Sequence, residues 1–387
     1  MLCLIGCQQE KTGPTLKELA SAEWNSARSR VLVSLANDQY KSGNFDKSRH
    51  TVAEAMKLTP DDAGLHLLSA KLAIEGGQLE LAEQELKIVR QHAPGDGEAY
   101  YLSGVIYQRW QKPETAFEFY QQASAKAPAE LAYVLAESEM LVAMDRLPEA
   151  MQLLQGKVTY FEHSGAIRDA VGQMLMQARR YPEAMAMFRE ACILSENDLG
   201  VRERFSLALH AVGSYQECSE NLSRLLEDKS YARRADLLVL LGDCQLQLGN
   251  PRAARITFES ATQLDALSAR AWQGFGHAAL ECGDIKRAAG ALAHAVALDP
   301  TNADSHLLLG YVQLREQHLN DALASFQKAN AADAGDTVSL CMMGYVLDKM
   351  GRGSDAMQYY TRALKIKPGD EMAAKLITGL DPLDQDE

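Results

Sequence analysis

The chain is poor in residues that interrupt helices, and it lacks the long apolar runs that cross membranes. Only 11 of its 387 residues are proline, and no run of 18 apolar residues occurs. Sparse proline allows many helical segments, and the missing apolar run excludes a transmembrane helix. Valine, isoleucine and threonine form no alternating runs, so the pattern typical of half-buried β-strands is also missing.

The sequence also lacks the motifs that carry common catalytic and metal chemistry. It has no phosphate-cradling glycine loop, no HExxH and no GxSxG, and its seven cysteines form no CxxC pair. The five cysteines beyond Cys7 fall in helical patterns, where a thiol is ordinarily a small core residue. His277 and Glu281 are four residues apart and are expected to form a solvated helix pair. We therefore expect no catalytic residues, no metal site and no cofactor.

The charge balance is acidic and the composition favours helices. Asp and Glu number 52 against 39 Lys and Arg, which gives a net charge of −13. An acidic surface repels phosphate backbones, so nucleic acid is not an expected partner. Hydrophobic residues make up 47% of the chain, enough for a folded core, and good helix formers dominate the composition.

A small residue recurs with a period of 34 along most of the chain. Its ten positions are Ser48, Ala82, Ala116, Ala150, Ala184, Cys218, Ala254, Ala288, Ala322 and Ala356, and every interval is 34 except one of 36. Twelve residues before each stands another small residue, and four residues after each stands a large apolar or aromatic one. This pattern predicts helical hairpins that approach closely at the small sites, with the large residue filling the space between neighbouring hairpins.

The pattern resembles the tetratricopeptide repeat, a 34-residue unit with the signature W-x2-L-G-x2-Y, then A-x3-F, then P. The best match is Trp272-Gln-Gly-Phe275-Gly276, followed by Ala288, Leu292, Ala295 and Pro300. The resemblance implies an all-α, right-handed superhelical solenoid of about ten antiparallel helix-turn-helix repeats, with a capping helix at each end. It also implies a binding scaffold rather than an enzyme.

The repeat phase divides the chain into consecutive segments. Residues 1–13 are expected to be a truncated lipoprotein signal and tether, 14–28 an N-terminal capping helix, 29–370 the repeats, 371–380 a C-terminal capping helix and 381–387 an acidic tail. The repeats are 29–62, 63–96, 97–130, 131–164, 165–198, 199–234, 235–268, 269–302, 303–336 and 337–370. The two extra residues of the longer interval fall near 227–234, where either a longer surface turn or a change of superhelical pitch would fit.

The first residues contain a second, weaker resemblance. Leu4-Ile5-Gly6-Cys7 resembles the bacterial lipobox, in which the cysteine is lipidated, although only three residues precede it. The resemblance implies a lipid anchor at Cys7. Because Gln8 follows in place of an aspartate, it also implies an outer-membrane-anchored or periplasmic location in a Gram-negative-type bacterium. The alternative is a chance match in a cytoplasmic protein.

By the resemblance to the tetratricopeptide repeat, five positions on the first helix of each repeat face a concave groove. Many of them are apolar here: Val33, Tyr40, Leu67, Ile74, Tyr101, Val105, Leu135, Val142, Leu246, Leu307, Tyr311, Leu314 and Tyr345. Exposed apolar surface commonly marks a partner site, so these residues predict a groove for an extended or helical segment of another protein. The alternative is that they pack against adjacent helices.

The expected function follows from this groove. Some family members grip a C-terminal carboxylate with Lys and Asn at two groove positions, but Val33 occupies the lysine position that would accompany Asn37. We expect a scaffold for another protein or peptide segment, serving a bacterial envelope, pilus or secretion assembly. The alternatives are a soluble cytoplasmic adaptor and a regulatory subunit of a separately encoded enzyme. The sequence indicates neither the partner nor the oligomeric state.

Overall fold

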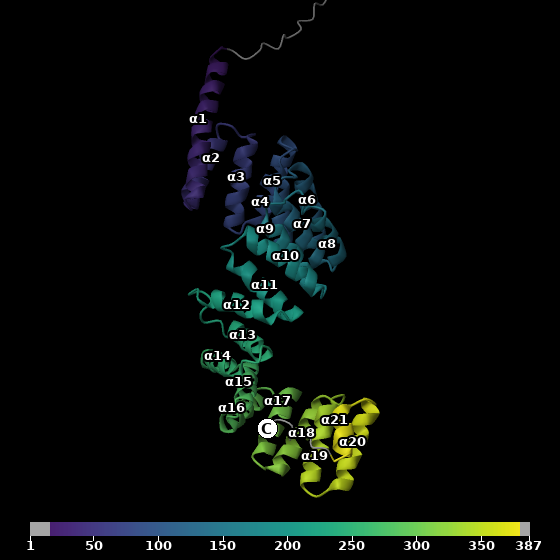
Figure 1. Ribbon diagram of the computed structural model, residues 1–387. Helices are drawn as coiled ribbons and strands as arrows, with labels where there is room; N and C mark the ends of the chain where they lie inside the picture. Colours follow the sequence, from purple (N-terminus) through teal and green to yellow (C-terminus); the bar gives the residue numbers. More distant parts are fainter. Residues whose placement is uncertain (1–15, 380–387) are drawn as a thin grey trace, which may run out of the picture. The chain divides into compact units, whose positions relative to one another are not determined.

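The computed structural model describes residues 16–379, and helices provide all of its regular secondary structure. Over those residues there are 21 helices and no strand, which confirms the predicted all-α class. The chain divides into two compact units, Met1–Met174 and Leu175–Glu387. Figure 1 follows the helices along the chain, and within each unit consecutive helices pack as antiparallel hairpins.

The first unit is built from four hairpins. Their helices are α1 (Leu16–Lys41), α2 (Phe45–Met56), α3 (Ala63–Glu75), α4 (Leu79–His92), α5 (Gly97–Arg109), α6 (Pro113–Lys126), α7 (Leu131–Ala143) and α8 (Leu147–Gln155). Each odd-numbered helix packs on the even-numbered helix that follows it, and each even-numbered helix up to α6 also packs on the next odd-numbered one. Helix α9 (Gly165–Gln177) lies where the two units meet in the sequence.

The second unit continues the same order. Its helices are α10 (Tyr181–Leu194), α11 (Leu199–Val212), α12 (Tyr215–Leu226), α13 (Ala235–Gln247), α14 (Pro251–Leu264), α15 (Ala269–Glu281), α16 (Ile285–Leu298), α17 (Ala303–Arg315), α18 (Leu319–Ala332), α19 (Thr337–Lys349), α20 (Gly353–Ile366) and α21 (Glu371–Ile377). Hairpins form from α11 with α12 through α19 with α20, and α21 packs on α19 and α20.

Each turn from an odd-numbered helix, α1 to α19, to the even-numbered helix after it passes through one residue in the left-handed backbone region. That residue is glycine in six turns, at positions 43, 77, 213, 249, 283 and 351. In the other four turns it is Gln111, Asp145, Arg179 or Gln317, with φ between 57° and 62°. Glycine adopts this region without penalty, whereas other L-residues lose roughly 1–2 kcal/mol. The turn geometry is therefore kept even where the sequence does not favour it.

The small and large residues of the repeat face each other inside a hairpin. A Cβ atom at Gly310 would lie 2.5 Å from Phe326 Cε1, and one at Gly344 would lie 2.3 Å from Tyr360 Cε1. Phe258 also reaches the next hairpin, because a Cβ at Gly274 would lie 2.2 Å from its ring. The large residue thus fills space both within its own hairpin and towards the next hairpin.

The recurring small residue lets the second helix of a hairpin lie close to the backbone of the first helix. The Ser48 hydroxyl donates to the Ala36 carbonyl at 2.8 Å, and the Cys218 thiol contacts the Ser206 carbonyl at 3.2 Å. Such distances require that no larger side chain stands between the helices. This geometry explains why Ser and Cys can replace Ala at this position.

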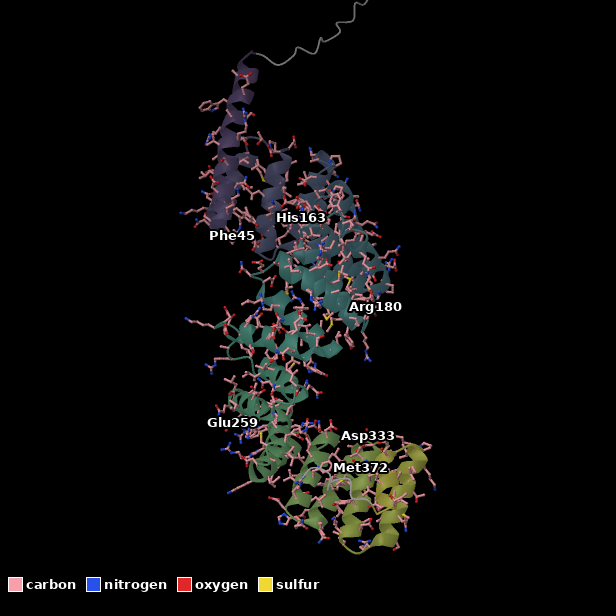
Figure 2. All side chains as sticks on the ribbon, in the orientation of Figure 1. Phe45, His163, Arg180, Glu259, Asp333 and Met372 are labelled. Carbon is pink, nitrogen blue, oxygen red and sulfur yellow. The ribbon has the colours of Figure 1, made fainter. Side chains whose placement is uncertain are left out.

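The N-terminal end differs from the prediction. A capping helix over 14–28 was expected to precede the first repeat, but α1 runs without interruption from Leu16 to Lys41. No glycine or proline stands between these residues, so nothing in the sequence breaks the helix at position 28. Its partner α2 begins at Phe45 and has only 12 residues, so the first turns of α1 extend beyond the hairpin (Figure 2).

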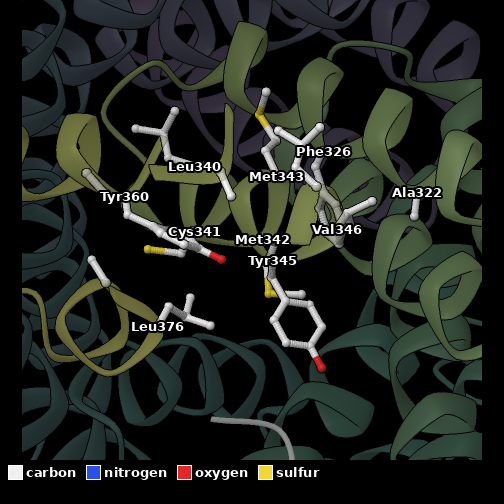
Figure 3. Close-up of a cluster of buried hydrophobic side chains, with 14 of the residues drawn as sticks. Ala322, Phe326, Leu340, Cys341, Met342, Met343, Tyr345, Val346, Tyr360 and Leu376 are labelled. Carbon is white, nitrogen blue, oxygen red and sulfur yellow. The ribbon is translucent and has the colours of Figure 1, made fainter. Parts of the chain in front are cut away.

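At the other end, a short helix closes the second unit. The Asp370 carboxylate accepts from the Ala373 backbone N–H at 2.9 Å and from the Thr337 hydroxyl at 2.7 Å, which caps α21 and ties it to α19. Leu376 then joins a buried cluster with Phe326, Val346 and Tyr360 (Figure 3). Because α19 is covered by α18, α20 and α21, most of its residues are buried.

The extra residues of the longer interval form a turn between α12 and α13. Residues 227–234 contain no regular helix, and the Asp228 carboxylate accepts from the Ser230 backbone N–H at 2.8 Å. The Ala232 N–H donates to the Asp228 carbonyl at 2.8 Å. A longer surface turn therefore accommodates the insertion.

We expect the contact between Gly310 and Phe326 to be strongly non-additive. Gly310→Ala should destabilise the second unit by about 1–3 kcal/mol because its Cβ meets the ring, and Phe326→Ala should cost about 3–5 kcal/mol. In the Phe326→Ala background the glycine substitution should cost almost nothing, since the opposing ring atoms are gone. Urea unfolding followed by circular dichroism measures all four chains. Equal costs in both backgrounds would show that the ring does not require the glycine.

Candidate partner-binding surface

The first helices of consecutive hairpins lie close together in each unit. Helix α1 contacts α3 and α3 contacts α5, while in the second unit α13 contacts α15 and α15 contacts α17. Over the described residues, second helices of consecutive hairpins show no contact of similar extent. The first helices therefore form the inner side of each stack, which is where the predicted groove residues stand.

In the first unit, the predicted groove residues are shared between the core and the surface. Val33 and Tyr40 are half-buried against the cluster around Ala36 and Leu68, and Leu67 is half-buried against the next cluster. Ile74 is only 7% exposed and belongs to that second cluster. The adjoining hairpin thus covers Ile74, which favours the alternative that this residue packs against adjacent helices.

The middle of the first unit carries an aromatic group. Tyr101 and Val105 are half-buried against the cluster of Tyr120 and Met140. The Tyr101 ring stacks on Tyr133 with centroids 4.8 Å apart and planes at 24°. Burial, together with the nearby Glu98 carboxylate, raises the pKa of Tyr133 to about 12. The tyrosine therefore stays neutral in any physiological buffer and remains a hydrogen-bond donor.

Polar and further apolar side chains flank this aromatic group. Lys71 Nζ lies 2.7 Å from Glu98 Oε1, which joins the first helices of two consecutive hairpins. Leu135 and Val142 on α7 are half-buried, and neither belongs to the core clusters described above. These two side chains retain exposed apolar surface on the helix that also carries Tyr133, so they are the best placed of the predicted residues for contact.

In the second unit, several of the corresponding positions on α11, α13 and α15 carry charged side chains that form ion pairs. Arg234 bridges Glu203 at 2.8 Å and Asp236 at 2.7 Å, and these hydrogen bonds raise the pKa of the arginine. Arg270 lies 2.5 Å from Asp243 on the preceding first helix. The pairs link consecutive first helices, as Lys71 and Glu98 do in the first unit.

His210 lies beside these charges. Burial lowers the pKa of its imidazole, with Asp243 opposing the shift and Arg270 adding to it. Its ring meets that of Tyr215 edge to face, at a centroid distance of 5.7 Å. The neutral form of the histidine is therefore favoured in the folded chain.

The last hairpins of the second unit are apolar on this side, but much of that surface is covered. Leu246 is half-buried against the cluster around Phe258, and Leu307 and Tyr311 are half-buried against the final cluster. Burial raises the pKa of Tyr311 to about 12. Leu314 and Tyr345 are each 8% exposed and are members of the final cluster. The closely packed end of the unit buries them, which favours the alternative that they pack against adjacent helices.

The pair of Lys and Asn that grips a C-terminal carboxylate in some family members is incomplete here. The Asn37 side-chain amide donates to the Val33 carbonyl of its own helix at 3.0 Å. The amide is thus engaged in α1 itself. No cation accompanies it at position 33, where valine stands.

Titratable groups elsewhere have local structural roles. Glu137 is buried on α7 and accepts a hydrogen bond from the Ser124 hydroxyl at 2.8 Å, while burial raises the pKa of its carboxyl. His277 Nε2 lies 3.9 Å from Glu281 Oε1, in a partly exposed i,i+4 pair. Within residues 16–379, no three His, Cys, Asp or Glu side chains gather as a metal ion would require. Among the described helices, none is long and apolar enough to span a bilayer.

The charged pairs and the Tyr133 stack were not predicted. Glu98, Asp236 and Arg270 each occupy the second position of a repeat, which the resemblance places on the inner side, so the signal was present in the sequence. Tyr133 stands at the third position, which is not one of the five positions that the resemblance places on the inner side. Cys7 lies outside the described residues, as does the tail over 381–387.

Tandem helical hairpins with an inner face of mixed apolar and charged side chains define a class of helical repeat proteins. Tetratricopeptide repeat models match residues 19–105, 97–125, 165–202, 235–266, 274–337 and 338–370. Together these matches cover most of the chain. The chain belongs to the tetratricopeptide repeat family.

Solved structures match parts of this chain. A tetratricopeptide repeat protein from Parabacteroides merdae is 14% identical, with 63% of this chain and 96% of that one covered and a TM-score of 0.50. MamA from Desulfovibrio magneticus is 19% identical over 45% of this chain and 98% of that one, with a TM-score of 0.42. YrrB, described as having an unusual peptide-binding site, is 19% identical over 49% and 97%, with a TM-score of 0.42. A search of curated proteins gave no match.

We expect His210 to make the second unit less stable in mild acid. Because its folded-state pKa is depressed, the unfolded chain binds more protons, so stability falls as the pH drops through the unfolded value of about 6.5. His210→Gln should therefore lose less stability than the natural chain between about pH 8 and pH 5.5. Urea midpoints at several pH values measure the difference. Parallel pH profiles for the two chains would contradict this assignment.

Proposed function

We propose that the chain is a protein-binding scaffold that holds a segment of another protein along the first helices of its hairpins. The observation that carries the proposal is that Leu135 and Val142 on α7 are only half-buried and belong to none of the core clusters described above, while Tyr133 of the same helix stacks on Tyr101. A bound segment would bury the apolar surface that these side chains still expose to water. The membership of the tetratricopeptide repeat family supports this function.

The surroundings of these residues indicate the character of the bound segment. Apolar and aromatic contact would supply affinity in the first unit, while the Lys71–Glu98 pair offers a cation and an anion nearby. Along α11, α13 and α15 ion pairs between consecutive helices stand among the uncharged side chains, which favours a segment with charges of both signs. Two stretches of different character would allow the scaffold to hold two kinds of segment.

A bacterial envelope, pilus or secretion assembly is the setting that we propose for this scaffold. The support is the lipobox-like Leu4-Ile5-Gly6-Cys7, which would place a lipid on Cys7 and tether the repeats to the outer membrane. Labelled palmitate should enter the chain, and Cys7→Ala should abolish its incorporation. Equal labelling of the two chains, or none, would favour a cytoplasmic adaptor or a regulatory subunit.

We expect substitutions on α7 to weaken peptide binding without unfolding the chain. Random peptides displayed on phage and selected on the immobilised full chain would provide the ligands. Leu135→Ser with Val142→Ser should raise their dissociation constants by about tenfold or more, because each lost apolar contact is worth about 1 kcal/mol or more. These residues are preferred to Leu67 and Tyr101, which also support core clusters.

Ile193→Ser is the matched control. Ile193 is exposed on α10, a second helix, and its replacement should leave affinity unchanged. Circular dichroism verifies the helicity of every variant. If the α7 variants bind as well as the natural chain, the inner face is not the binding surface. If they lose helicity, their side chains serve packing instead.

A further inference from the structure

Each later hairpin buries one face of its first helix against the hairpin before it. Leu65, Leu68 and Leu72 on α3 share a cluster with Val52 and Ala55 on α2. The same arrangement joins α5 to α4 and α15 to α14, so it recurs in both units. The residues in question stand at the third, sixth, seventh or tenth position of their repeats. This face is built to receive the second helix of a preceding hairpin.

Helix α1 carries the same kind of face with nothing packed on it in the described chain. Val31 and Leu35, at the third and seventh positions of the first repeat, are 68% and 46% exposed. Trp24, two turns before Val31 on the same side of the helix, is 70% exposed. A different side of α1 packs inward through Leu32, Ala36 and Tyr40. Apolar side chains thus occupy two faces, although only one has a partner.

An end repeat with an apolar outer face departs from the usual design of repeat proteins. Terminal repeats ordinarily present a polar surface outward, because an apolar end makes the array associate. The other end of this array follows that design, since α21 packs on α19 and α20 and buries Ala373 and Leu376. The closed C-terminal end disfavours head-to-tail stacking of chains. The open face of α1 would then be matched by the same face of another copy.

We propose that two copies of this chain form an antiparallel, two-fold symmetric dimer through the outer face of α1 defined by Trp24, Ala27, Val31 and Leu35. Such an interface is self-complementary and closes at two chains, so it yields a dimer and no filament. Residues seven apart repeat on one side of a helix, which lets Trp24 of each copy pack between Ala27 and Val31 of the other.

Charges on the edge of this face fit the same register. Glu23 and Arg30 are exposed and seven residues apart, so they share one edge of α1. In an antiparallel pair the same edges of the two helices face each other. Placing Trp24 between Ala27 and Val31 brings Glu23 of each copy level with Arg30 of the other. The antiparallel arrangement thus forms two equivalent ion pairs.

Sedimentation equilibrium of the full chain over a wide concentration range tests the proposal. The natural chain should show a reversible monomer–dimer equilibrium. Val31→Glu combined with Leu35→Glu should raise the dimer dissociation constant by more than about tenfold, because it buries charge in the interface. Ile256→Glu, at a similarly exposed apolar side chain on α14, is the matched control and should leave the equilibrium unchanged. Thermal unfolding should be the same for all three chains.

A charge exchange tests the register itself. Glu23→Arg alone should weaken the dimer by placing like charges together, and adding Arg30→Glu should restore it. A natural chain that stays monomeric overturns the proposal, as does a dimer that survives the α1 substitutions or a charge exchange that fails to restore it. A chain that dimerises only after removal of residues 1–13 would show that this segment covers the face. Trp24-dependent binding to phospholipid vesicles by a monomer would assign the face to a membrane.

Discussion

The fit between one small and one large residue in each hairpin determines how closely the helices approach. At Gly310 and Phe326 the ring lies where a Cβ would otherwise stand, and the same relation joins Gly344 to Tyr360. Because the aromatic ring of the second helix fills this space, the facing position of the first helix has no room for a side chain. The fixed spacing in turn aligns the first helices on the inner side of each unit. The position of every inner-face residue depends on this contact.

The hairpins were predictable from the sequence because this contact leaves a regular trace of small and large residues 34 apart. Where the trace stops, prediction was less successful. A separate capping helix was expected before residue 29, but α1 continues to Lys41 because helix propensity persists through 28 without a glycine or proline. The 34-residue spacing predicts which residues of a hairpin are in contact, but it does not predict the residue at which a helix begins.

The predicted inner-face residues show a second limit. Periodicity places Ile74, Leu314 and Tyr345 on the same side as Leu135 and Val142, yet the first three are buried by their neighbours. How much of a side chain remains exposed depends on the residues of the adjoining hairpin, which the spacing of a single repeat does not describe. Ion pairs between hairpins, such as Arg270 with Asp243, were missed for the same reason, since they join residues 27 apart.

The second helix of the α7–α8 hairpin has a consequence for how the array opens. Helix α8 has 9 residues, whereas the second helices of the other hairpins have 12 or 14. In a linear array each hairpin is supported only by the hairpins next to it, so local stability varies along the chain. Backbone amides of this hairpin should therefore exchange with deuterium before those of the neighbouring α5–α6 hairpin. The side chains that we assign to partner binding lie on α7, so occupancy of that surface would slow the exchange there most.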